Sequence, residues 1–180
     1  MNNELLVTAK KIYDNLKDMI SNPHLQIGIM RSMPEFTLDL DKVLFMDSLR
    51  FMLYVAESDG EITMREANVI NYITGEYFPL QALREIVSED RDFYIYSMPT
   101  LPMSVKIFCE VENIMYRNDS EGLENSLMNA IITYFELIGL LISQADAEVS
   151  YKEKERVVGM INTIKKYAEE NTLSPFFSVD

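Results

Sequence analysis

The residues with the clearest chemical potential in this chain are two similar groups of acidic side chains, separated by 87 positions. The first group lies in the segment LYVAESDGEITMREANVI (53–70), and the second lies in LLISQADAEVSYKEKERVV (140–158). The acidic residues at equivalent positions are Asp59, Glu61 and Glu66 in the first segment and Asp146, Glu148 and Glu153 in the second. Grouped carboxylates can bind a hard divalent cation or transfer protons. The repeat indicates a duplicated unit of helix, acidic loop and helix.

Part of this repeat has a structural explanation. Thr63-x-x-Glu66 and Ser150-x-x-Glu153 match the capping box, in which a hydroxyl and a carboxylate satisfy the free amides of a helix's first turn. Loss of such a cap costs about 0.5–2 kcal/mol of stability. Capping accounts for the two glutamates at the helix starts, but it does not require the acidic residues that precede each cap.

A standard EF-hand does not fit either segment. Asp59-Gly60-Glu61-Ile62 followed by Glu66 matches the second half of a calcium loop. The first loop position, however, would be Val55 in one segment and Ile142 in the other. Neither side chain can ligate an ion, so we exclude this type of site.

The elements that carry these segments are predicted to be helices, because apolar residues recur at spacings of three and four throughout the chain. We expect helices at about residues 5–20, 38–57, 64–74, 79–87, 102–117, 122–143 and 151–169. Asn22-Pro23 should end the first helix, and residues 24–37 are left unassigned because Gly28 and Pro34 interrupt the pattern. Residues 88–102 read as an irregular or helical connector, although their aromatic run Phe93–Tyr96 could pass for a strand.

The predicted fold class is therefore all-α, a compact bundle of about seven to eight helices with a pseudo-twofold repeat. Residues 1–37 should pack as a helix and connector on a helical domain of residues 38–170. Residues 171–180 form an apolar tail. The tail could fold back onto the domain or present Phe176 and Phe177 to a partner, and we expect the former.

Composition limits the function classes. The 16 basic and 29 acidic residues give a net charge of −13, which argues against nucleic acid or an anionic membrane as the partner. One His and one Cys exclude a zinc cluster and a disulfide. The most apolar segment, Leu127–Ile142, is interrupted by Asn129 and Glu136 and is too short to span a membrane. We expect a soluble cytoplasmic protein.

The two acidic motifs, VAESDGEITMREANVI and ISQADAEVSYKEKERVV, resemble those of the TerB-like family, the helical domain associated with tellurite resistance. This domain is also similar to a module in some membrane-anchored DnaJ-type co-chaperones. The resemblance covers residues 38–168 and implies an all-helical domain with acidic residues gathered on one face, an association with divalent metal, and no established enzymatic activity. It implies the candidate metal ligands Asp59, Glu61, Glu66, Asp146, Glu148 and Glu153. Ala147 stands where the family has a glycine.

Two functions follow as hypotheses. In the first, the two acidic loops meet and bind Ca²⁺, Mg²⁺ or Mn²⁺, in a stress- or resistance-associated protein. In the second, the chain is a scaffold whose acidic surface recruits an unidentified basic protein and holds no metal; its 12 methionines suit irregular partner surfaces. We do not expect an enzyme, because His24 lies in a loop or helix-start context and Cys109 lies on an apolar helix.

Overall fold

A computed structural model describes residues 3–34, 39–89, 100–118, 126–146 and 150–173. Within these ranges the chain forms eight α-helices and one 3₁₀ turn, η1 (Glu57–Asp59), and contains no strand. The α-helices are α1 (Asn3–Ile20), α2 (Pro23–Ser32), α3 (Leu40–Ala56), α4 (Met64–Thr74), α5 (Leu80–Glu89), α7 (Met103–Asn118), α8 (Leu127–Ser143) and α9 (Tyr151–Asn171). The all-α prediction is confirmed.

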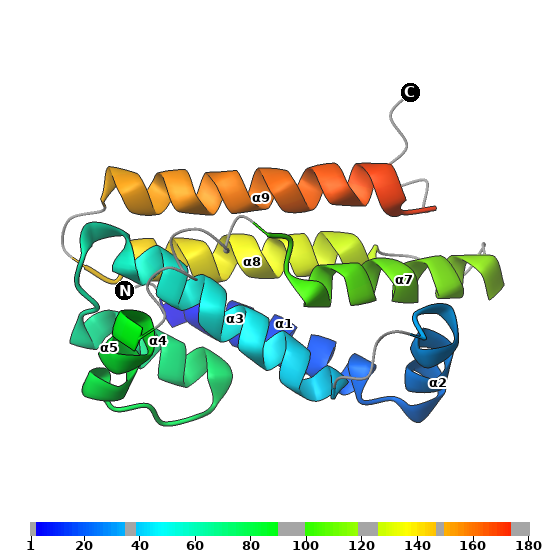
Figure 1. Cartoon of the computed structure of the whole chain (residues 1–180), viewed down its shortest axis with the longest axis horizontal. Helices are drawn as coiled ribbons and strands as arrows, with labels where there is room; N and C mark the ends of the chain where they lie inside the picture. Colours follow the sequence, from blue (N-terminus) through cyan, green and yellow to red (C-terminus); the bar gives the residue numbers. More distant parts are fainter. Residues whose placement is uncertain (1–2, 35–38, 90–99, 119–125, 147–149, 174–180) are drawn as a thin grey trace.

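Helix α8 is the centre of the bundle, because apolar residues occupy nearly its whole circumference. It packs against α1, α3, α7 and α9, and Figure 1 shows α9 lying along it, with α2 and α5 at opposite ends of the molecule. Tyr134 of α8 is fully buried, and its hydroxyl donates a hydrogen bond of 2.7 Å to Ser48 Oγ in α3. Burial of its apolar residues contributes to the hydrophobic stabilisation of the fold.

The Val157 side chain of α9 packs directly against α8 at Gly139. A Cβ atom at this position would lie 2.8 Å from Val157 Cγ2 and 3.2 Å from a ring carbon of Phe51. A side chain larger than hydrogen would force these neighbours apart. Gly139 therefore sets the spacing of the two helices that lead into and out of the second acidic loop.

The helix left unassigned by the sequence is α2. Asn22-Pro23 ends α1 as predicted, but the same residues also begin α2: Asn22 Oδ1 accepts a hydrogen bond of 2.9 Å from the amide of His24, and Pro23 occupies the first turn. Gly28 does not break this helix, because it faces Ile114 of α7. The prediction that Asn22-Pro23 ends the first helix is correct, but residues 24–37 were left unassigned and α2 was therefore missed.

Most other boundaries lie within about two residues of those predicted, and α9 extends to Asn171. The start of α8 was wrong: this helix begins at Leu127 and not at residue 122, because Ser126 caps its first turn by accepting a hydrogen bond from the amide of Asn129. The predicted connector begins later than expected, since α5 continues to Glu89, and the aromatic run Phe93–Tyr96 lies outside the described residues. Residues 174–180 also lie outside them. At the start of the tail, the amide of Leu173 donates a hydrogen bond of 2.7 Å to Asn113 Oδ1 of α7.

Candidate cation-binding site

The first acidic loop begins where α3 passes into the 3₁₀ turn. Gly60 ends this turn with a φ of 102°, a left-handed conformation that favours glycine. The Asp59 carboxylate accepts a hydrogen bond of 3.2 Å from the amide of Glu61, so the side chain stabilises the turn. Asp59 is exposed, and the chain continues from this turn to the N-cap of α4 at Thr63.

Both predicted capping boxes are present. In the first, the amide of Thr63 donates to Glu66 Oε2 at 2.7 Å, and the amide of Glu66 donates to Thr63 Oγ1 at 3.3 Å. In the second, the amide of Ser150 donates to Glu153 Oε2 at 2.8 Å. Each glutamate is only 2% exposed, so the caps place two carboxylates in the protein interior.

The two acidic segments meet at Thr63. Its Oγ1 lies 2.9 Å from Asp146 Oδ1 of the second segment and 3.0 Å from Glu66 Oε2 of its own. The hydroxyl carries a single proton and can donate it to only one of these oxygens at a time. The fold therefore brings carboxylates from both acidic segments to one hydroxyl group.

These carboxylates influence one another electrostatically. Burial raises the pKa of Glu66 to about 7, hydrogen bonds from Thr63 oppose this rise, and the charges of Asp146 and Glu153 add to it. Burial also raises the pKa of Glu153, opposed by the hydrogen bond from the Ser150 amide and reinforced by the charges of Asp59 and Asp146. We call Asp59, Glu66, Asp146 and Glu153 the carboxylate cluster.

The other two predicted ligands stand apart from this cluster. Glu61 Oε1 lies 2.5 Å from Nη2 of Arg84 in α5, and the Glu61 side chain is 72% exposed. Its carboxylate therefore pairs with an arginine. Glu148 lies outside the described residues. The structure thus brings four of the six predicted residues within electrostatic reach of one another.

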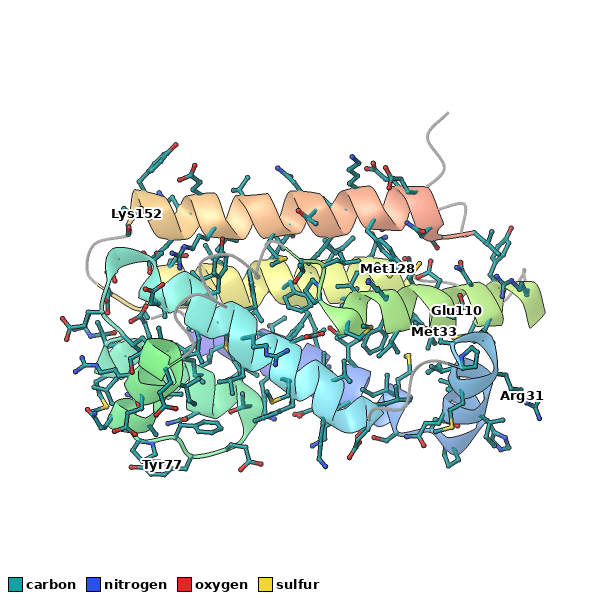
Figure 2. The ribbon with its side chains drawn as sticks, in the orientation of Figure 1. Arg31, Met33, Tyr77, Glu110, Met128 and Lys152 are labelled. Atoms are coloured by element: carbon teal, nitrogen blue, oxygen red, sulfur yellow. The ribbon has the colours of Figure 1, made fainter. Side chains whose placement is uncertain are left out.

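Two arginines that the sequence reasoning missed support the site. Arg84 Nε and Nη2 donate hydrogen bonds of 3.0 and 2.8 Å to the carbonyl oxygen of Ile62. Arg156 of α9 donates to the carbonyl oxygen of Tyr54 and lies 3.1 Å from Glu57 Oε2, with its guanidinium 4.4 Å from the Tyr54 ring centroid. Arg156 thereby joins α9 to the end of α3. Figure 2 shows Lys152, in the first turn of α9, at the left end of that helix.

The chemistry of the donor set fits a hard cation, since it consists of carboxylate and hydroxyl oxygens. Among the residues that the structure describes, no three His, Cys, Asp or Glu side chains already converge as a metal-binding group. Binding would therefore require the side chains of Asp59 and Asp146 to turn toward the buried glutamates. Asp59 is exposed and Asp146 half-buried, and both can move without repacking the core.

The fold and the site define an all-helical protein with two capped, acidic helix starts in contact. Comparison with models of protein families, with curated proteins and with solved structures found no match to this chain. The resemblance to TerB-like domains stays a prediction that rests on the two motifs. In the described parts of the chain, every helix falls short of the length and apolar character that a membrane crossing needs.

Proposed function

We propose that this protein is a non-catalytic, TerB-like domain, stress- or resistance-associated, that binds one divalent cation at the carboxylate cluster. The observation that carries the proposal is the contact of Thr63 Oγ1 with both Glu66 and Asp146, at 3.0 and 2.9 Å. This contact joins the two copies of the acidic motif. The glutamates of the motif, Glu66 and Glu153, are buried, and burial disfavours their ionised forms.

A cation would act here as a stabiliser of the contact between helices. Ionised carboxylates that are close together repel, and a divalent ion converts that repulsion into attraction. It would link the loop before α4 to the loop before α9, which are far apart in sequence. Oxygen ligands favour Ca²⁺, Mg²⁺ or Mn²⁺ over softer metals.

The direct test is a thermal melt of the metal-free protein with and without each of these three ions. At a concentration of a hundred times Kd, a single site adds about 2.7 kcal/mol to the free energy of unfolding. Because any salt screens the net charge of −13, the control is NaCl at matched ionic strength. A shift no larger than that caused by NaCl would contradict the proposal.

A double variant, Asp59→Asn with Asp146→Asn, tests the location of the site. Neither residue forms part of a capping box, so both helix starts keep their caps. We expect the cation-dependent rise in melting temperature to disappear in this variant. A rise equal to that of the unaltered protein would place the ion elsewhere.

A second candidate function, a scaffold that recruits a basic partner, is favoured by two exposed side chains. Met64 and Tyr151 are the first residues of α4 and α9, stand at equivalent positions of the repeat, and are 58% and 78% exposed. They flank the carboxylate cluster in sequence. A labelled peptide rich in lysine and leucine should bind the protein, with an affinity that falls as salt is added. The double variant Met64→Ser/Tyr151→Ser should bind this peptide more weakly. Equal binding by the variant and the unaltered protein would reject this role.

A further inference from the structure

One strip of the central helix α8 is left uncovered by its neighbours. Helices α1, α3, α7 and α9 pack around α8, and most of its residues are buried. Its exposed residues and its C-cap recur at spacings of four and seven, which places them along one side of the helix: Asn129, Thr133, Leu140 and Gln144. Leu140 is 39% exposed, so this strip presents an apolar side chain to solvent.

A groove of about 470 Å³ lies between this strip and α9. Its apolar lining comes from Leu140 of α8 and from Val157 and Val158 of α9, and Val158 is 58% exposed. The Ser143 hydroxyl also lines the groove, but it already donates a hydrogen bond of 2.9 Å to the Gly139 carbonyl oxygen of its own helix. The groove therefore offers a surface that the apolar side chains of a partner can cover.

Basic side chains stand at both ends of the groove. Lys154 lines it near the start of α9, and at the other end Lys165 Nζ lies 2.7 Å from Glu136 Oε1 of α8. Among the described residues Lys154 takes part in no ion pair, so its ammonium group can pair with a carboxylate of another molecule. Helix α9 carries five basic and four acidic residues, whereas the chain has a net charge of −13. The groove is a locally basic, apolar site on an acidic protein.

We propose that the groove between α8 and α9 binds an amphipathic helix of a partner protein, whose apolar stripe is flanked by acidic side chains. The stripe covers Leu140 and Val158, and a carboxylate beside it pairs with Lys154. The bound helix lies against the open strip of α8 as α1, α3, α7 and α9 lie against its other sides. Figure 1 shows α9 at one edge of the bundle, where a further helix can approach. The inference is independent of the proposed cation site.

The charge of the chain favours a short partner helix over a second copy of the chain. Two copies would each bring a net charge of −13, and their mutual repulsion opposes association. A short helix meets mainly the charges near the groove, because salt screens interactions beyond about 8 Å at physiological ionic strength. Glu155 follows Lys154 in α9, but it is rotated by about 100° around the helix axis and does not line the groove.

The experiment is a fluorescence anisotropy titration of the full chain with labelled peptides of about 18 residues, long enough to form a helix when bound. The probe peptide has leucine at positions i, i+3, i+4 and i+7, with glutamate beside this stripe. A second peptide has glutamine in place of each glutamate, and a third contains the residues of the probe in scrambled order. We expect saturable binding of the probe, weaker binding of the glutamine peptide, and binding of the scrambled peptide weaker by about tenfold or more.

Substitutions in the groove locate the binding. Val158→Asp places a charge in the apolar contact and should raise Kd about tenfold. Val7→Asp in α1 is the matched control, because Val7 is 57% exposed and does not line the groove, and it should leave Kd unchanged. Lys154→Gln should raise Kd for the probe about two- to fivefold and remove most of its advantage over the glutamine peptide. Circular dichroism establishes that each variant is folded; should Val158→Asp be unfolded, Val158→Asn carries the same comparison.

Hydrogen exchange supplies a second readout, since bound probe should slow amide exchange in residues 136–144 and 151–158. Absence of binding, equal binding of the scrambled peptide, or equal losses in Val158→Asp and Val7→Asp would overturn the inference. A dimer of the unaltered chain in sedimentation that Val158→Asp dissociates would also overturn it, because a second copy would then occupy the groove. The cation-dependent melts are a separate measurement, so failure of either proposal leaves the other intact.

Discussion

Replacing Glu66 with glutamine should stabilise the metal-free protein at neutral pH and leave its stability nearly unchanged at pH 4.5. The pKa of Glu66 is raised from 4.5 to about 7 in the folded protein, mainly by burial. The folded state therefore binds this proton more tightly than the unfolded state does. The contribution of this bound proton to the free energy of unfolding is complete below pH 4.5 and is lost as the pH rises through about 7. Glutamine stays neutral and can keep the capping hydrogen bond to Thr63.

The magnitude follows from the gap between the two pKa values. At 1.36 kcal/mol for each pH unit, ionising Glu66 inside the fold costs about 3 kcal/mol above pH 7. Because the neighbouring Asp59 is exposed and Asp146 is only half-buried, water screens this site and lowers the figure to about 1–3 kcal/mol. The difference in stability between the variant and the unaltered protein should therefore rise from near zero at pH 4.5 to about 1–3 kcal/mol at pH 8.

Urea unfolding between pH 4.5 and 8, with chelator and at constant ionic strength, measures this difference directly. Subtracting the two curves removes the titration of groups common to both proteins. Glu169→Gln, an exposed change in α9, is the control and should show no such trend. A difference that does not vary with pH would refute the reasoning, because the buried glutamate would then ionise as easily as in the unfolded chain.

Two further substitutions test the geometry of the site and of the bundle. Ser150→Ala removes only a cap and should cost about 0.5–2 kcal/mol of stability in urea unfolding. Thr63→Val removes a cap and also the contact with Asp146, so it should cost about 1 kcal/mol more than Ser150→Ala does. Equal losses in the two variants would contradict this expectation. Gly139→Ala should lower stability by about 1–3 kcal/mol because its Cβ would lie 2.8 Å from Val157, and thermal melts should show partial recovery when Val157→Ala is added.

Local signals in the sequence predicted seven of the eight described α-helices, all except α2, and both capping boxes. A hydroxyl three residues before a glutamate satisfies the first turn of a helix by itself, so Thr63-Glu66 and Ser150-Glu153 could be assigned without knowing the fold. The same chemistry appears at Asn22, where the cap of α2 was overlooked because proline is also a signal for the end of a helix.

The contacts that assemble the site could not be predicted, because they join residues distant in sequence. The motifs give the carboxylates of each segment but not the approach of Thr63 to Asp146, which depends on how α4 and α9 pack around α8. Arg84 and Arg156 belong to no motif, and only the fold brings them to the carbonyl groups of Ile62 and Tyr54. Glu61 is acidic and correctly spaced, yet a nearby arginine determines its orientation.

The Thr63–Asp146 contact also bears on folding kinetics. It closes a loop between residues 83 positions apart, whereas each capping box spans three. Long-range contacts carry a larger chain-entropy penalty before they form, so both capped helices can assemble while the two loops are still separate. An ion that recognises only the joined loops would then have no partner in the folding transition state. It would lengthen the lifetime of the native protein by slowing unfolding, and leave the rate of folding unchanged.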